Sequence, residues 1–205
     1  MTDLSAYAAA AEKAFEQTKQ LLSDNGWTPR KQGEGCTLEE RELPGEPIKA
    51  FKVEGIINRP AKECGDKLWN FRQTEWQKMD SDCELFNVVE EGDDLRLVYQ
   101  LNKIPWPLWQ RDVSVLWRRS EEDGVFYFVA TSIDNPKVPE YKDKYVRATL
   151  TFSLIAFAPE GDNKTKITRV IHVNPAGNIP AAFVNASADR MLQLPGKMEK
   201  VFGEM

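Results

Sequence analysis

Residues 98–119 of the chain read VYQLNKIPWPLWQRDVSVLWRR. Two strand-like segments flank a loop here, because Pro105 and Pro107 have no N–H to donate within a central strand. Pro107 also moves Trp106 away from helical geometry. Alternate side chains of a strand point to opposite faces of the sheet. The apolar face of the second segment, which we expect to point inward, consists of Val113, Val115 and Trp117.

Further strand-like segments continue on both sides of this stretch. Turn signals rich in Gly, Asp and Pro separate them at 44–45, 91–94 and 123–124. Short strands that follow one another through tight turns are typical of an antiparallel sheet. The predicted strands cover 36–44, 48–58, 83–91, 94–102, 112–119, 125–133, 145–157 and 165–174.

Three helical segments accompany the strands. Residues 2–24 place apolar side chains three and four positions apart, which predicts a helix with one apolar stripe. A second helical block covers about 60–79 and has proline in its first turn. The last helix covers about 179–203, and the Pro-Gly pair at 195–196 should kink or interrupt it. This order predicts a single α+β domain over 1–205, an antiparallel sheet with helices segregated to one face.

Composition excludes several classes of function. The chain has 205 residues and a net charge of -5, so no nucleic-acid partner is expected. Its three cysteines are scattered and it has one histidine, which argues against a disulfide framework, a metal site and a histidine-based catalytic relay. No cofactor is expected. Acidic residues interrupt any targeting segment near the N-terminus, and no apolar run reaches the length of a membrane span, so we expect a cytoplasmic protein.

Four segments in a fixed order carry a family resemblance. They are 75–100, 98–119, 129–150 and 170–185, the last reading VIHVNPAGNIPAAFVN. Over about residues 25–203 the chain resembles the START (StAR-related lipid transfer) family, and within it the small single-domain cytosolic carriers. The resemblance implies a helix-grip fold, in which a curved antiparallel sheet wraps around a long C-terminal helix and encloses a lipid tunnel. It further implies a monomer without enzymatic activity that carries one lipid and contacts membranes transiently.

The resemblance also answers why a loop carries so many large apolar side chains. In START domains this loop flanks the tunnel mouth and faces the C-terminal helix. Carried over, Trp106, Leu108 and Trp109 form the gate and contact the membrane, a place that suits the amphipathic indole ring. The alternative is that these rings fold back into the core. The adjacent Arg111 and Asp112 are expected to anchor the loop rather than to bind a headgroup.

The family register implies which side chains line the tunnel. It turns the threonines of strand 145–157 inward, whereas the alternation of that strand alone would turn them to solvent. The only titratable group near the predicted inner face is His172, for which a structural role is favoured over ligand binding. The predicted lining consists of Gln100, Asn102, Val113, Val115, Trp117, Thr149, Thr151 and Ser153 on the sheet, with Phe183 and Met191 on the last helix.

The predicted lining favours an uncharged lipid. Choline-binding START domains use aromatic side chains at positions that are Gln100, Val113 and Thr151 here, and a charged pair at positions that are Gln73 and Gln77 here. A weakly polar lipid with a hydroxyl or carbonyl, such as a sterol, fits better. Three alternatives stay open: transfer of a phosphatidylcholine-type phospholipid, a helix-grip enzyme acting on a small hydrophobic substrate, and a ligand-gated module that binds a protein partner.

Overall fold

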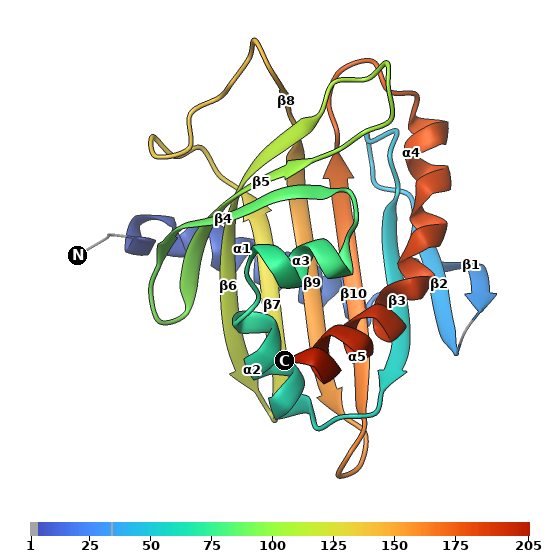
Figure 1. The fold of residues 1–205 in the computed structure, drawn as a ribbon. Helices are drawn as coiled ribbons and strands as arrows, with labels where there is room; N and C mark the ends of the chain where they lie inside the picture. Colours follow the sequence, from blue (N-terminus) through green and yellow to red (C-terminus); the bar gives the residue numbers. More distant parts are fainter. Residues whose placement is uncertain (1–3, 34) are drawn as a thin grey trace.

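A curved sheet dominates the computed structural model, which describes residues 4–33 and 35–205 (Figure 1). Within these residues the sheet has ten strands in the order β1-β2-β3-β10-β9-β7-β6-β5-β4. All pairs along this path are antiparallel, and the short β8 pairs with β6 in parallel off the path. The strands are β1 (Thr28–Gly33), β2 (Cys36–Arg41), β3 (Ala50–Ile57), β4 (Cys83–Glu91), β5 (Leu95–Asn102), β6 (Arg111–Glu122), β7 (Val125–Ser132), β8 (Val146–Arg147), β9 (Thr149–Pro159) and β10 (Thr165–Asn174).

The predicted strands are confirmed, and β1 is an addition. Residues 28–33 read TPRKQG and have no apolar alternation, so the sequence pattern did not predict them as a strand. They form an edge strand that is held by backbone pairing with β2, and most of their side chains are exposed. An edge strand needs no apolar face to be stable when its neighbour supplies the hydrogen bonds.

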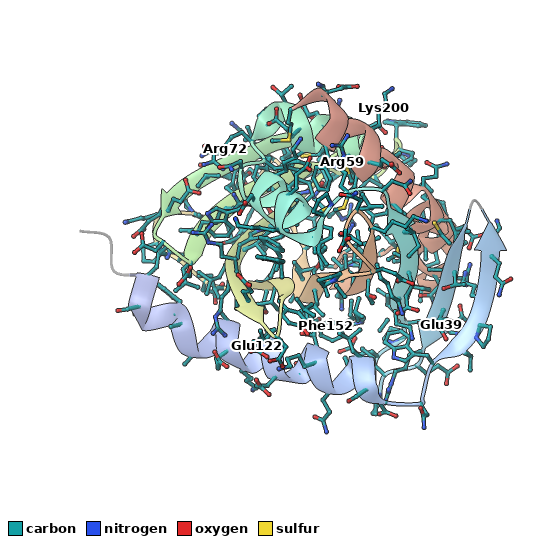
Figure 2. The ribbon with its side chains drawn as sticks, turned by 90° about the horizontal axis from the view of Figure 1, so that it is seen from below. Glu39, Arg59, Arg72, Glu122, Phe152 and Lys200 are labelled. Carbon is teal, nitrogen blue, oxygen red and sulfur yellow. The ribbon has the colours of Figure 1, made fainter. Side chains whose placement is uncertain are left out.

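The N-terminal helix covers the outer face of the sheet. The prediction of a helix over 2–24 is met by a 3-10 turn, η1 (Leu4–Tyr7), and α1 (Ala8–Ser23), while residues 2 and 3 lie outside the described residues. Phe15 of α1 packs in a cluster with Val129 and Leu154, which are outward-facing side chains of β7 and β9. Figure 2 shows α1 on the opposite side of the sheet from the C-terminal helices. Helices therefore cover both faces, rather than one as expected, because the outer face carries its own apolar side chains.

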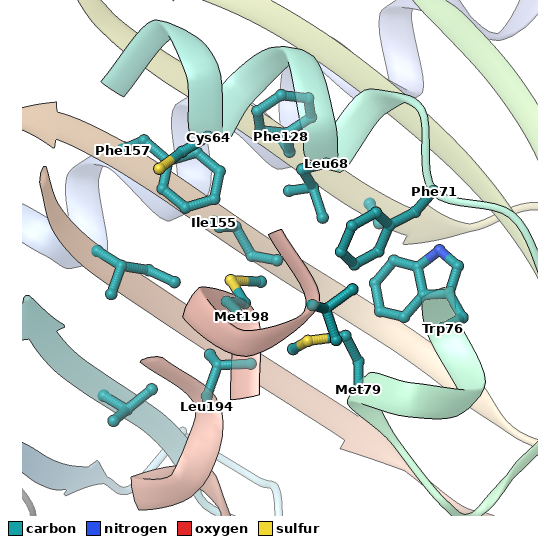
Figure 3. Close-up of a cluster of buried hydrophobic side chains, with 14 of the residues drawn as sticks. Cys64, Leu68, Phe71, Trp76, Met79, Phe128, Ile155, Phe157, Leu194 and Met198 are labelled. Atoms are coloured by element: carbon teal, nitrogen blue, oxygen red, sulfur yellow. The ribbon is translucent and has the colours of Figure 1, made fainter. Parts of the chain in front are cut away.

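Two short helices pack on the inner face where one block was predicted. They are α2 (Ala61–Trp69) and α3 (Gln73–Met79). The chain leaves the helix at Asn70 and starts again with a capping box, in which the Arg72 N–H donates to Glu75 Oε2 at 3.0 Å. Cys64 and Leu68 of α2 and Trp76 and Met79 of α3 enter the main core with the inner face of the sheet (Figure 3).

The C-terminal segment is three short helices in place of the predicted helix over 179–203. They are α4 (Ala181–Ser187), the 3-10 helix η2 (Ala188–Gln193) and α5 (Leu194–Glu204). Pro195 lies in the first turn of α5, where its missing N–H is not required, so it begins a helix rather than kinking one. Met198, which Figure 3 shows within the core, and Phe202 of α5 are fully buried. By contrast, α4 has no buried residue. The C-terminal part of this segment, α5, is therefore anchored in the core, and its N-terminal part, α4, is exposed.

Across the described residues, no helix is both long enough and apolar enough to span a membrane.

Candidate functional site

A cavity of about 400 Å³ lies between the inner face of the sheet and the C-terminal segment, and we call it the inner cavity. Phe51 of β3 and Ile171 of β10 contribute to its sheet wall. Ala188 and Met191 of η2 and Leu194 of α5 contribute to its helical wall. The volume falls within the range of small-molecule sites, and most of these side chains are apolar.

A second cavity, of about 500 Å³, opens beside the proline-rich loop, and we call it the mouth cavity. Ile104 and Pro105 of the loop between β5 and β6 form one side of it. Ile179 and Phe183, at the start of the C-terminal segment, form another. The residues that line both cavities are Val184, Ser187 and Arg190. The two spaces are therefore neighbours along α4, and the mouth cavity leads toward the inner one.

The loop at the mouth exposes large apolar side chains. Trp106 is 92% exposed and Trp109 is 54% exposed, while Leu108 is half-buried. Phe183 of α4 is 55% exposed and lines the mouth cavity. The two predicted gate tryptophans thus do not fold back into the core. Neither they nor Leu108 borders the mouth cavity, which Ile104 and Pro105 of the same loop line, so their role as a gate stays a prediction.

Arg111 ties the two sides of the mouth together, as the sequence predicted for an anchoring residue. Its guanidinium donates to the carbonyls of Pro175 at 2.9 Å, of Ala176 at 3.0 Å and of Trp109. One charged group thereby joins the proline-rich loop to the turn between β10 and α4. Burial is the cause that lowers the pKa of Arg111, but three carbonyl acceptors satisfy its charge.

Asp112 is buried and pairs with Arg147 of β8. Two hydrogen bonds of 3.0 and 2.9 Å join the carboxylate to the guanidinium. The pair fixes the long connection between β7 and β9 against the start of β6, so it is structural. Neither Arg111 nor Asp112 lines the inner cavity or the mouth cavity.

The inward orientation predicted for β6 is observed. Val113, Val115 and Trp117 belong to the main core, whereas Leu116 belongs to a cluster on the outer face. Gln100, opposite Val113 in β5, donates to Asn102 Oδ1 at 2.7 Å. None of these predicted lining residues of β5 and β6 borders either cavity, so their contact with a ligand stays a prediction.

A β-bulge turns the predicted polar side chains of β9 in different directions. Phe152 pairs with His172 and Leu150 with Val173, so Thr151 is the extra residue. Ser153 keeps the inward direction, since its partner residues Ile171 and Ala130 lie on the inner face. At Thr151 and Thr149, before Ser153 in the strand, the structure differs from the expected register.

The bulge changes the environment of the two threonines. Thr151 Oγ1 lies 2.9 Å from His172 Nδ1, and the other ring nitrogen of His172 lies 3.2 Å from the Ile48 carbonyl oxygen. Thr149 is exposed, and it does not border either cavity. Burial lowers the pKa of His172, which is fully enclosed on the outer side of the sheet. The favoured structural interpretation of His172 is confirmed.

The positions predicted for a headgroup pair hold two amides with structural partners. Gln73 Nε2 and Gln77 Nε2 donate to the Glu84 carbonyl at 2.9 and 3.1 Å, and Gln73 Oε1 accepts from the Phe86 N–H. Arg72, one residue away, pairs with Glu91 at 2.8 Å on the surface. These side chains hold α3 against β4 and leave no charged pair at this end of the site.

Two arginines on the inner face were missed, one fully buried and one partly buried. Arg96 of β5 is fully buried, donates to the Trp69 carbonyl at 2.7 Å and lies 4.4 Å from the ring centroid of Trp69. Burial lowers its pKa to about 10. It sits among aromatic rings that close the α2–α3 end of the inner face, with Trp117 at 5.5 Å.

The second missed residue is Arg169 of β10, which lines the inner cavity. The alternation of 165–174 places it on the same face as Ile167 and Ile171, and this pattern was the signal that could have found it. The inner face therefore carries a titratable group that the sequence interpretation did not count. Burial lowers the pKa of Arg169, and the nearby carboxylate of Asp80 opposes that shift.

Metal chemistry has no ligand set within the described residues, where no group of three or more His, Cys, Asp or Glu side chains gathers. All three cysteines are buried, and Cys64 and Cys83 are free thiols. Burial raises the pKa of Cys64 and of Cys83 to about 11, so both thiols stay protonated at neutral pH and are poor nucleophiles.

The geometry agrees with comparisons to known proteins. A family model described as START domain matches residues 7–193. The ceramide transfer protein of Mus musculus is 32% identical over an alignment of 174 residues, which covers 75% of this chain and 27% of that protein. The chain thus spans about a quarter of the length of that relative. The StAR-related lipid transfer protein 5 of Bos taurus is 24% identical and matches over its whole length and 98% of this chain.

Solved structures show the same fold. Human StAR-related lipid transfer protein 5 superposes with a TM-score of 0.84, with 98% of each chain covered and 21% sequence identity. Human STARD10 superposes with a TM-score of 0.82, covering 94% of this chain and 79% of that one at 21% identity.

Proposed function

The chain belongs to the START domain family, and from this premise we propose that it binds one lipid between the inner face of its sheet and its C-terminal segment and transfers it between membranes. The transfer is proposed to be non-enzymatic, and the names of the relatives describe them as transfer proteins. We further propose that the protein acts as a monomer in the cytoplasm, where free thiols such as Cys64 and Cys83 persist.

The observation that carries this proposal is the pair of neighbouring cavities beside the proline-rich loop. The inner and mouth cavities, of about 400 and 500 Å³, offer space for a lipid chain. The exposed rings of Trp106 and Trp109 belong to the loop whose Ile104 and Pro105 line the mouth cavity, and the exposed Phe183 lines it from α4. Tryptophan favours the interface between lipid headgroups and acyl chains, so this loop suits a transient membrane contact.

We propose that α4 is the part of the C-terminal segment that opens. Its described polar ties to the sheet side come from Asn185, whose Oδ1 accepts from the Lys49 N–H at 3.0 Å and whose Nδ2 donates to the Pro47 carbonyl at 3.4 Å. By contrast, α5 buries Met198 and Phe202. A lid of 179–203 was expected, and burial favours limiting it to the first two turns, since segments with few buried apolar contacts open most easily.

The side chains that line the site bear on the class of lipid. An uncharged, sterol-like lipid was predicted from side chains of β5, β6 and β9, and a phosphatidylcholine-type lipid was the alternative. Both remain proposals for the part of the ligand that would reach Gln100 and Trp117. Neither lipid class accounts for Arg169 on the wall of the inner cavity, a cation with no ion-pair partner among the described residues.

Crosslinking across the mouth tests the proposal. The variant Ile104→Cys with Phe183→Cys puts one thiol on each side of the mouth cavity, and a short bismaleimide then joins the proline-rich loop to α4. The native cysteines are buried, and the thiols of Cys64 and Cys83 stay protonated, so the reagent is directed to the new pair. Transfer of fluorescent sterol, phosphatidylcholine and phosphatidic acid between vesicles is followed in parallel.

We expect the wild type to transfer at least one of these lipids and the crosslinked variant to transfer none, while the variant without reagent serves as the matched control. Unchanged transfer after complete crosslinking would contradict the gate. No transfer of any of these lipids by the wild type would contradict the proposed function.

A further inference from the structure

Arg169 occupies the middle of the sheet, on its inner face. It pairs with Val53 of β3 and with Ile155 of β9, both of which belong to the main core. Its guanidinium enters the inner cavity from the sheet wall. Within residues 4–33 and 35–205, no hydrogen bond or ion pair of its side chain is found, and its Nε is buried without a partner.

Three other arginines of the fold have described acceptors for their side chains. Arg111 has three carbonyl acceptors, and Arg147 has a two-point hydrogen bond to Asp112. Arg96 has a carbonyl acceptor and three aromatic rings within 5.8 Å, although its Nε and Nη2 are buried without a described partner. Arg169 is partly buried and has no described acceptor, so its guanidinium is available to an anionic group of a ligand.

The surroundings of Arg169 are positive although the whole chain is negative. Five cations line the two cavities against the carboxylates of Asp80 and Asp82. Lys49 is paired with Glu40 at 2.7 Å and Arg190 with Asp82, which leaves Lys103, Arg169 and Lys197 in excess over Asp80. The net charge of the chain is -5, so this cluster opposes the overall charge. A cavity with low-dielectric walls focuses such a field and favours ligands of opposite sign.

The nearest neutralising group is only partly available to Arg169. Asp82 pairs with Arg190 at 2.6 Å, which leaves Asp80 as the carboxylate of the inner cavity. Asp80 is exposed, and its Oδ1 already accepts the Asp82 N–H at 3.0 Å. The carboxylate thus acts on Arg169 through space and forms no described ion pair with it.

We propose that Arg169 binds the anionic end, a carboxylate or a phosphate, of the lipid that this cavity takes up. The flat guanidinium can meet two oxygens of either group at once, which a hydroxyl or a sterol ring cannot match. The acyl chain then extends past Ile171 and Val184 toward the mouth cavity. This inference rests on the proposed function and narrows it to an anionic amphiphile.

Paired lipids that differ in charge alone test the inference. The protein is equilibrated with phosphatidylcholine vesicles containing equal amounts of dioleoyl phosphatidic acid and dioleoylglycerol, or of oleate and oleyl alcohol, and is reisolated. Mass spectrometry counts the bound lipids. We expect the wild type to prefer the anionic member of at least one pair by about 10- to 100-fold, the range of a charged hydrogen bond.

Arg169→Met should lose that preference and still bind the neutral members. Arg118→Met, which removes a cation paired with Glu12 on the outer side of the sheet, is the matched control and should keep the preference. Asp80→Asn should keep it too, which separates headgroup binding from a purely structural pair with Asp80.

Equal uptake of both members by the wild type, or an unchanged preference in Arg169→Met, would overturn the inference and leave lipid carriage intact. No bound lipid of any kind would overturn the proposed function as well. Inorganic phosphate alone serves as a further arm. If it raises the melting temperature of the wild type while no anionic lipid binds, the site takes a free anion and the lipid proposal is wrong.

Discussion

Gly55 of β3 sets how closely α5 approaches the sheet. A Cβ at this position would lie 2.6 Å from Pro195 Cγ, 2.9 Å from Cys36 Sγ and 3.1 Å from Pro195 Cβ. Favourable carbon contacts are about 3.5–4.0 Å, so the proline ring would have to move by roughly 1 Å. The ring is rigid and opens α5, so the helix must move with it. Overpacking of this kind costs about 1–3 kcal/mol.

We therefore expect Gly55→Ala to lower the free energy of unfolding by about 1–2 kcal/mol, after the entropy that alanine removes from the unfolded chain is allowed for. This corresponds to a decrease in melting temperature of about 2–8 °C for a domain of this size. The matched control is Gly196→Ala in α5, where a Cβ meets nothing within 4 Å. It should stabilise the protein by about 0.5–1 kcal/mol.

Urea unfolding followed by tryptophan fluorescence measures both variants. Hydrogen exchange adds a local readout, since Gly55→Ala should speed exchange in α5 more than in α1, which lies on the other face of the sheet. If Gly55→Ala is as stable as the wild type, α5 does not need its observed distance from β3. The distinction between a fixed α5 and a mobile α4 would then fail.

Three further predictions concern the mouth, a buried ion pair and pH. Trp106→Ala with Trp109→Ala should slow vesicle-to-vesicle transfer with stability unchanged to about 0.5 kcal/mol, because both rings are exposed; an unchanged rate would contradict the gate. Arg147→Met leaves the Asp112 carboxylate buried and unpaired and should cost about 3–5 kcal/mol in urea unfolding, and a cost under about 1 kcal/mol would refute this. Burial lowers the pKa of His172 from 6.5, so its contribution to the free energy of unfolding is present above pH 6.5 and is lost as pH falls below it. His172→Gln should therefore make the free energy of unfolding depend less on pH in this range, and an equal dependence in both proteins would count against this prediction.

Much of the fold could be predicted from local patterns. The alternation of 165–174 matches β10 residue for residue, since one side of that strand packs against the core and the other against its own outer cluster. By contrast, β1 has no such alternation, and backbone pairing to β2 stabilises it. The break at Asn70 was also missed, because the apolar spacing of α2 and α3 continues across it.

The site was harder to predict, since it depends on local irregularities and on packing. The facing of Val113 and Val115 followed from period-two alternation alone. The bulge at Thr151 reverses that rule within β9, and a single sequence carries no clear sign of a bulge. Arg169 obeyed the alternation and could have been found, but the partners that an arginine has, or lacks, are known only once the strands and helices are packed together.

Native mass spectrometry of the protein after equilibration with vesicles of mixed lipids tests lipid carriage most directly. The two cavities and the family predict a single added mass on each chain, equal to that of one lipid, and the crosslinked Ile104→Cys, Phe183→Cys variant should fail to acquire it. A spectrum that contains only the mass of the unliganded chain, under conditions that keep the protein folded, would contradict the account.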